Sequence, residues 1–447
     1  MKQSKRIQLS DHFTYGRLLR FVASPVLMMI CTSLYSIVDG FFVSNFVGKT
    51  PFAAVNLIMP VTMGIGTVGF MVGTGGSAVV SKALGEGRRD RANEYFSMLV
   101  YLSAAAGILL SAAAFVFTPQ IARALGAEGE LLRDCVVYGR ILFAGETAFI
   151  LQCEFQSFFS AAEKPGLSLK ISLLSGMTNV VLDFLFIAVL GYGLAGAAAA
   201  TVMGQLVGGI APLFYFAGKN DSLLRLGRTR IYGRTLALSC ANGASEMVSN
   251  LSMSVVNILY NFQLMRMVGE NGVAAYGIIM YVNFVFTAIF FGYAIGSSPI
   301  VSFHYGAGNE SELQNLFCKS AALVCAVGVI MVALAEALAG PMAELFAGYD
   351  RELFEMTCRG FRLYSLSFFM MGINIWGSAF FTALNNGAVS AAISFLRTLL
   401  FQLAAVAVLP ALLGIDGVWL AIVAAELAAL LVTGAFFAAQ RKNYRYA

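Results

Sequence analysis

The sequence predicts an all-α integral membrane protein with twelve transmembrane helices in two six-helix lobes, related by a pseudo-twofold axis along the membrane normal. Three observations lead to this fold class. Hydrophobic residues make up 59% of the chain and charged residues only 12%, whereas a soluble domain carries about 25% charged residues. Twelve apolar stretches are long enough to cross a bilayer, and the second half of the chain repeats landmarks of the first.

Each predicted span is a window of about 20 or more apolar residues, the length needed to cross roughly 30 Å of hydrocarbon. The windows are residues 20–46, 52–80, 95–117, 135–160, 167–190, 194–217, 235–264, 272–301, 315–338, 353–383, 389–411 and 415–439. The first window is too long for the apolar region of a signal peptide. We therefore expect it to remain in the protein as the first span.

Basic residues gather in short connections between the spans, as cytoplasmic loops do under the positive-inside rule. Residues 81–94 hold four of them and residues 219–234 five. We therefore expect a multi-pass protein of the cell inner (cytoplasmic) membrane with both termini cytoplasmic. The net charge of +5 follows from this orientation, so we expect the lipid bilayer as a partner and no nucleic acid.

The repeat is visible in the loops. Gly85 and Gly306 stand at matching places in related glycine-rich sequences, and FFSAAEKPG at Phe158 resembles FFTALNNGA at Phe380. Both matches have nearly the same offset along the chain, close to half of its length. Six spans return the chain to its starting side, so the two copies are parallel and enclose a central cleft. We expect an N-lobe at residues 1–218 with spans 1–6, a cytoplasmic linker at 219–234, and a C-lobe at 235–447 with spans 7–12.

Four polar residues lie inside N-lobe spans: Asp39 in the first, Asn179 and Asp183 in the fifth, and Thr201 in the sixth. A charge at the bilayer centre costs roughly 2.5–3.5 kcal/mol even on a lenient scale, so such residues usually line a water-filled path or bind something. Asp39, Asp183 and Thr201 share a level roughly 12–14 Å below the outer ends of their spans. The alternative is structural, with Asp39 capping a kink near Gly40 and Asp183 satisfied by a neighbouring helix.

Two carboxylates in one dry site cannot easily both be charged, and a proton or a sodium ion would relieve their repulsion. Asn179 and Thr201 supply neutral oxygens that a small hard cation can use. We therefore expect H⁺ or Na⁺ as a coupling ion and no other cofactor. If a metal binds, we expect Na⁺ at Asp39, Asn179, Asp183 and Thr201.

Other charged residues within spans are less informative singly. Glu246 lies near the middle of the seventh span on a face of small and polar residues, which suits a cavity wall or a hydrogen-bonded packing position. Glu146, Glu154, Arg397 and Glu426 are either cavity groups or pairs between the lobes.

Several segments resemble the multidrug and toxic compound extrusion (MATE) family: SLYSIVDGFFVSNFVG, FAAVNLIMPV and NVVLDFLFIAVLGYGLAGAAAAT, with the repeated GxG loops. The resemblance extends over essentially the whole chain. It implies a secondary active antiporter that exports organic, cationic amphiphilic compounds in exchange for protons or sodium ions by alternating access. It also implies partners that are small organic cations or drugs, and we expect a monomer without enzymatic activity.

The resemblance further implies roles for particular residues. Asp39, Asn179, Asp183 and Thr201 match the N-lobe cation site of the family, and Pro25 matches the proline where the first helix bends. Asn374 stands in span 10 where some members have a carboxylate partner for the span-7 acid, so a second cation site is not expected from the sequence. Glu246, Glu154 and Asn374 are the candidates for the substrate cavity.

Other functions remain open. A lipid-linked oligosaccharide or lipid flippase of related architecture fits the fold, although its cavity should hold more cationic groups than one mid-span arginine, Arg397. The loop GEGRRDR suggests a major facilitator, but its glycine spacing differs from that family's motif. An intramembrane enzyme is disfavoured because His12 and His304 are expected outside the spans and no HExxH, GxSxG or serine–lysine motif occurs.

Overall fold

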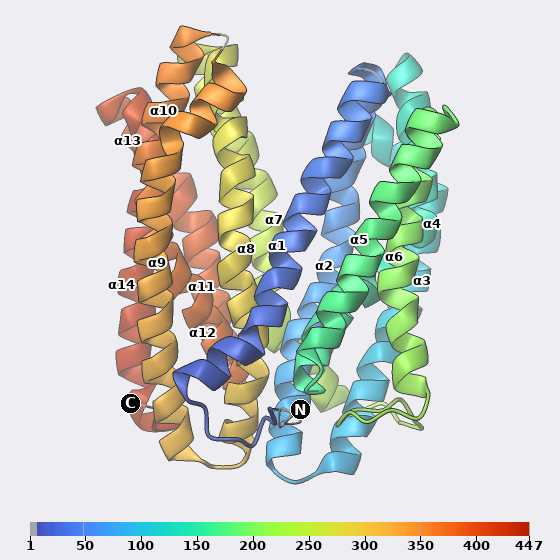
Figure 1. Ribbon diagram of the computed structural model, residues 1–447, viewed down its shortest axis with the longest axis vertical. Helices are drawn as coiled ribbons and strands as arrows, with labels where there is room; N and C mark the ends of the chain where they lie inside the picture. Colours follow the sequence, from blue (N-terminus) through green and yellow to red (C-terminus); the bar gives the residue numbers. More distant parts are fainter. Residues whose placement is uncertain (1–6, 48, 349, 447) are drawn as a thin grey trace, which may run out of the picture.

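The computed structural model describes residues 7–47, 49–348 and 350–446, and it consists of two bundles of long helices (Figure 1). The N-lobe contains α1 (Tyr15–Phe46), α2 (Lys49–Gly85), α3 (Arg89–Ala124), α4 (Gly129–Ala161), α5 (Pro165–Asp183) with the π turn η1 (Phe184–Val189), and α6 (Gly193–Ala217). The C-lobe contains α7 (Gly233–Val268), α8 (Glu270–Gly306), α9 (Glu310–Ala347), α10 (Arg351–Ser365), α11 (Ser367–Ala383), α12 (Gly387–Phe395) with the π turn η2 (Leu396–Leu400), α13 (Phe401–Leu413) and α14 (Ile415–Tyr444). Residues 1–6 of the expected N-lobe lie outside the described residues.

These elements confirm the fold class, because they form twelve helical rods in the described chain. Three of the rods combine consecutive elements, namely α5 with η1, α10 with α11, and α12 with η2 and α13. Nine described helices are long and apolar enough to cross a membrane, and the α10–α11 pair, bent by 44°, can form a tenth. The other two rods are α4, which carries several charged residues, and α7, which is rich in serine and asparagine. His304, expected outside the spans, is instead buried in the last turn of α8.

The internal repeat is present in the backbone as well as in the sequence. Glu163 and Asn385 occupy equivalent places in the two halves, and both adopt a left-handed conformation with φ 58°, although neither is glycine. Gly87 (φ 76°) and Gly308 (φ 65°), a second equivalent pair, follow their helices in the same way. A positive φ is uncommon for a residue with a side chain, so its recurrence at the repeat spacing shows that both halves use the same turns.

The two lobes cross closely at the end of the molecule that carries both termini, here called the terminus end (Figure 1). A Cβ atom on Gly85 of α2 would lie 1.9 Å from the carbonyl oxygen of Phe303 in α8. A Cβ atom on Gly306 would lie 2.1 Å from the carbonyl oxygen of Lys82. Lys82 and Phe303 have the same offset along the chain as Gly85 and Gly306, so the contact is reciprocal. The pseudo-twofold axis therefore passes through this glycine contact.

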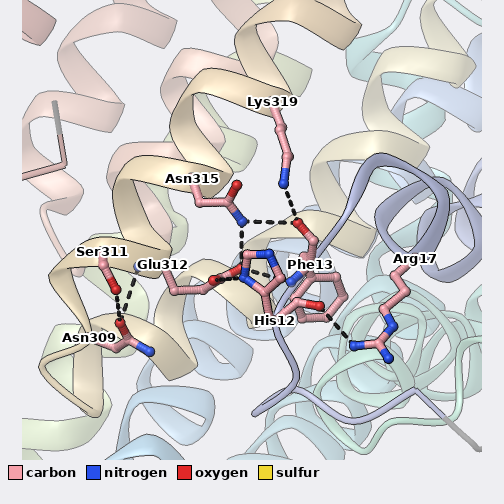
Figure 2. A network of polar contacts seen from close by, with 8 residues as sticks. All are labelled: His12, Phe13, Arg17, Asn309, Ser311, Glu312, Asn315 and Lys319. Atoms are coloured by element: carbon pink, nitrogen blue, oxygen red, sulfur yellow. Dashed lines mark hydrogen bonds and ion pairs between the residues drawn. The ribbon is translucent and has the colours of Figure 1, made fainter.

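The segment before α1 also joins the lobes at the terminus end. The amide of Leu9 donates to Glu163 Oε1 in the α4–α5 turn at 2.7 Å, and the amide of Phe13 donates to Glu312 Oε1 in α9 at 2.8 Å. Figure 2 shows the second contact, where His12 Nδ1 lies 2.6 Å from Glu312 Oε2 and Lys319 Nζ donates to the Phe13 carbonyl at 2.7 Å. This segment is therefore anchored to both lobes.

The connection between the lobes, residues 218–232, is not helical in the structure. It packs along α3, where the amide of Arg225 donates to Asn93 Oδ1 at 2.8 Å and the amide of Gly227 donates to Ser97 Oγ at 3.0 Å. From the terminus end the two bundles diverge toward the opposite end (Figure 1).

Candidate functional site

Three of the four polar residues expected in the N-lobe come together between α1 and α5. Asp39 in α1 and Asp183 at the end of α5 lie close enough for their carboxyl groups to interact directly, and Asn179 lies beside Asp39 and Asp183. Asp39 is 8% exposed and Asp183 is fully buried. The structure thus places two acids and an amide in one enclosed site, here called the acid pair site.

Small residues allow the helices of this site to approach one another. The ring of Tyr35 in α1 lies against Gly176 in α5, where a Cβ atom would be 2.0 Å from the ring. In α6, a Cβ on Gly204 would lie 2.9 Å from the carbonyl oxygen of Ser175 and 3.1 Å from Asn179 Cβ, and Ser175 Oγ donates to the Gly204 carbonyl at 2.6 Å. These contacts fix the side of α5 that faces α1 and α6.

The acid pair site has unused hydrogen-bonding capacity. Both carboxyl oxygens of Asp183, one of Asp39 and the side-chain nitrogen of Asn179 are buried without a hydrogen-bond partner among the described residues. Burying an unpaired charge is costly, so the three carboxyl oxygens fit a site that takes up a cation. In addition, α5 changes to the π turn η1 directly after Asp183, and π turns often mark functional sites.

Thr201 is not joined to the acids by a hydrogen bond. Its hydroxyl donates to the Ala197 carbonyl of its own helix at 3.1 Å, and its oxygen lone pairs remain able to coordinate a cation. No cluster of three or more His, Cys, Asp or Glu residues suited to a metal ion occurs among the described residues. A sodium ion here would therefore need the neutral oxygens of Asn179 and Thr201.

Tyr138 of α4 is a member of the site that the sequence did not reveal. It is 1% exposed and lies close enough to Asp39 and Asp183 to interact electrostatically with both. The chain contains 17 tyrosines, and no local pattern singles this one out.

A cavity of about 240 Å³ lies between the lobes, lined by residues of α1, α2, α4, α7, α8 and α11. Glu246 of α7 is its one charged lining residue in the described chain, and Met63, Met253, Phe149 and Phe291 supply part of an apolar wall. We call this space the central cavity. Its position agrees with the expectation that Glu246 belongs to a cavity wall.

The other expected site residues lie elsewhere. Glu154 is fully buried where α4 packs against Gly73 of α2, and it does not line the central cavity. Asn374 is also fully buried and donates to Glu426 Oε2 at 2.7 Å within the C-lobe. Pro25 lies within the continuous helix α1 where it crosses α8, with its carbonyl oxygen 2.8 Å from where a Cβ of Gly292 would stand.

The two helical lobes, with their long apolar spans and the cavity between them, define a multi-span membrane protein. The MatE family profile matches residues 25–185 and again residues 247–407, once in each lobe. The chain belongs to this family of efflux transporters, as the sequence resemblance predicted. Its many apolar spans place it in a cell membrane.

Individual relatives agree with this assignment. The chain is 22% identical over 435 residues to the multidrug export protein MepA of Staphylococcus aureus strain MRSA252, covering 96% of this chain and 95% of that protein. It is 23% identical over 339 residues to MepA of Staphylococcus haemolyticus, covering 75% of each. A crystal structure of a MATE protein in complex with MaL6 superposes with a TM-score of 0.93 at 23% identity, covering 99% of this chain and all of the other.

Proposed function

We propose that this protein is a secondary active antiporter that exports organic, cationic amphiphilic compounds in exchange for protons or sodium ions by alternating access. The observation that carries the proposal is the acid pair site, because Asp39 and Asp183 are buried side by side with carboxyl oxygens that lack hydrogen-bond partners in the described chain. The coupling role of Asp39, Asn179, Asp183 and Thr201 belongs to this proposal.

Cation binding at the acid pair site supplies a driving force for movement. When both carboxyl groups are charged they repel each other at short range in a medium of low dielectric constant. A proton or a sodium ion removes that repulsion and favours a closer fit of α1 against α5. Because α1 also packs against α8 of the other lobe at Gly292, the bound cation biases the equilibrium between two arrangements of the lobes. Pro25, at that crossing, is the proposed hinge.

The central cavity supports an organic cation as the exported compound. Glu246 provides the single negative charge of its described lining, and the surrounding methionine side chains adapt to ligands of varied shape. Phenylalanine faces attract cations. The matching relatives are named multidrug export proteins, which agrees with drugs as substrates.

The lobe boundaries and the orientation are part of the same proposal. We assign residues 1–218 to the N-lobe, 219–234 to a cytoplasmic linker and 235–447 to the C-lobe. Both termini would be cytoplasmic in the inner membrane, and the chain would act as a monomer. With this orientation the terminus end is the cytoplasmic end, and the two bundles diverge toward the outer face (Figure 1).

The test is efflux of the cationic dye ethidium from proteoliposomes, with a pH gradient and a sodium gradient imposed separately. We expect one of the two gradients to drive accumulation of the dye against its own gradient. Glu344→Gln, which changes an exposed acid of α9 outside both cavities, should transport normally. Dye movement that ignores both gradients would overturn the proposed antiport. Scrambling of a labelled lipid-linked sugar without dye efflux would instead favour the flippase alternative.

A further inference from the structure

A second buried polar centre lies in the C-lobe, and the proposed ion exchange does not use it. Arg397 Nε donates to both carboxyl oxygens of Glu426, at 2.8 and 3.1 Å. Asn374 Nδ2 donates to the same carboxyl group at 2.7 Å, and Thr433 Oγ1 donates to Asn374 Oδ1 at 3.0 Å. Arg397 and Glu426 are thus an ion pair within one lobe rather than a pair between lobes. Glu426 is fully buried and well supplied with donors.

Arg397 keeps most of its donors unused. A guanidinium group carries five N–H bonds in a planar fork, and only the Nε–H is bound here. Neither Nη atom donates a hydrogen bond to any residue in the part of the chain that the structure describes. Neither of them is among the buried side-chain atoms that lack a hydrogen-bond partner. They are therefore accessible from the space that Arg397 borders. That space is a cavity of about 460 Å³, here called the C-lobe cavity.

The wall of the C-lobe cavity combines polar groups with aromatic rings. Tyr260, Tyr276 and Tyr364 contribute rings, Asn257 and Gln402 contribute amides, and Arg397 contributes its fork. Arg397 itself lies in the π turn η2, and Asp183 of the N-lobe directly precedes the π turn η1. Each lobe therefore has a charged residue at a π turn, a helix irregularity common at functional sites.

The C-lobe cavity and the central cavity are adjacent. Ser36, Ser249, Met253, Phe284, Thr287 and Phe291 line both of them. Glu246 of the central cavity is one helical turn before Ser249 on α7, and it lies close enough to Arg397 of the C-lobe cavity to interact with it electrostatically. A ligand that spans the two cavities can meet a negative charge at one end and a donor fork at the other.

We infer that Arg397 binds the carboxylate of a zwitterionic aromatic ligand whose cationic end faces Glu246, and this inference rests on the proposed function of the central cavity. The Arg397–Glu426 pair is neutral overall, so it offers directed donors without a net charge that would attract bare anions. Such a site suits a carboxylate that arrives with its own positive charge. An arginine fork can bind a carboxylate through two parallel hydrogen bonds, which a lysine cannot reproduce.

The experiment uses two dyes that differ only at the carboxyl group. Rhodamine 110 has a free carboxylate, and rhodamine 123 is its methyl ester. Binding of both to the purified full-length protein is measured by fluorescence polarisation. The main variant is Arg397→Gln with Glu426→Gln, which removes both charges and leaves no buried charge unpaired. We expect its affinity for rhodamine 110 to fall about tenfold, and its affinity for rhodamine 123 to change less than twofold.

Two further variants keep the test decisive. Arg397→Lys retains the positive charge beside Glu426 and loses the planar guanidinium, so it should also lose selectivity for rhodamine 110. This variant provides the test if the double variant does not fold. Arg359→Gln with Asp416→Asn removes an exposed ion pair and should leave both dyes unaffected. An unchanged ratio of the two affinities in the Arg397 variants would overturn the inference. Failure of the wild-type protein to bind either dye would overturn the proposed function as well.

Discussion

The close crossing of the lobes at Gly85 makes their separation at the terminus end sensitive to one methyl group. In Gly85→Ala, the new Cβ would lie 1.9 Å from the Phe303 carbonyl oxygen, whereas real Cβ contacts are essentially never under 3.0 Å. The neighbouring atoms are backbone and cannot turn away, so α2 and α8 must move apart by about 1 Å to restore ordinary packing. The substitution therefore disfavours the arrangement described here relative to one that is open at the terminus end.

The cost of such overpacking is about 1–3 kcal/mol. If the alternative arrangement relieves the clash fully, the population ratio of the two arrangements shifts by about 5- to 150-fold. Gly306→Ala should act in the same way, because its Cβ would meet the Lys82 carbonyl oxygen at 2.1 Å. Gly64→Ala is the matched control in α2, where nothing lies within 4 Å of the added atom.

The assay is the distance distribution between spin labels at Asp90 and Ser311, two exposed positions just after the paired loops. The seven native cysteines are replaced beforehand, since all are free. Gly85→Ala and Gly306→Ala should enrich the longer distances, and Gly64→Ala should match the parent protein. If Gly85→Ala and Gly64→Ala gave the same distribution, the crossing would not control the separation of the lobes.

The remaining predictions concern the sites and the N-terminal segment. Asp183→Asn should yield a folded protein without coupled efflux, because the amide keeps the shape and cannot take up a proton; full dye transport under an imposed gradient would contradict the assignment. Glu246→Gln should weaken binding of cationic dyes more than of neutral ones, and equal losses would count against its place in the substrate cavity. If protons are the coupling ion, dye affinity should be highest at alkaline pH and decline on acidification, since proton uptake at the acid pair site and dye binding in the central cavity favour opposite arrangements of the lobes and weaken each other by the same factor. Asp39→Asn with Asp183→Asn should flatten that dependence, as measured by dye titration across pH with and without sodium. Glu312→Gln removes a charged acceptor worth about 1.5–3 kcal/mol, so hydrogen exchange at the Phe13 amide should accelerate, and unchanged exchange would show that the anchor lies elsewhere.

The sequence was sufficient for the fold and for the core of the acid pair site. Long apolar windows reveal spans because the hydrocarbon thickness sets their length, and the repeat fixes the parallel arrangement of the lobes. Asn179 and Asp183 share a helix face because they are four residues apart. The meeting of Asp183 with Asp39 could be anticipated from depth, since both lie near the same ends of their spans.

Features that depend on the rotation of one helix against another could not be obtained in this way. Glu154 and Glu246 were both expected to line the substrate cavity, yet Glu154 faces the packed side of α4 and only Glu246 of the two lines the central cavity. Arg397 and Glu426 pair across different helices of the C-lobe. Sequence spacing contains no measure of such rotation. The burial of His304 was missed because α8 continues beyond the apolar window by one more turn.

The reciprocal contact of Gly85 with Phe303 and of Gly306 with Lys82 has the geometry of an isologous interface, in which residue i of one unit meets residue j of the other and the reverse also holds. Two separate six-helix chains with this loop would associate as a symmetric dimer through the same surface. Because the two halves are covalently linked in one chain, their sequences need not be identical. The chain uses that freedom, since in the described residues the acid pair joins α1 to α5, whereas the arginine–glutamate pair joins η2 to α14. Fusion of two equal halves thus permits one transporter to hold an acidic site in one lobe and a donor fork in the other.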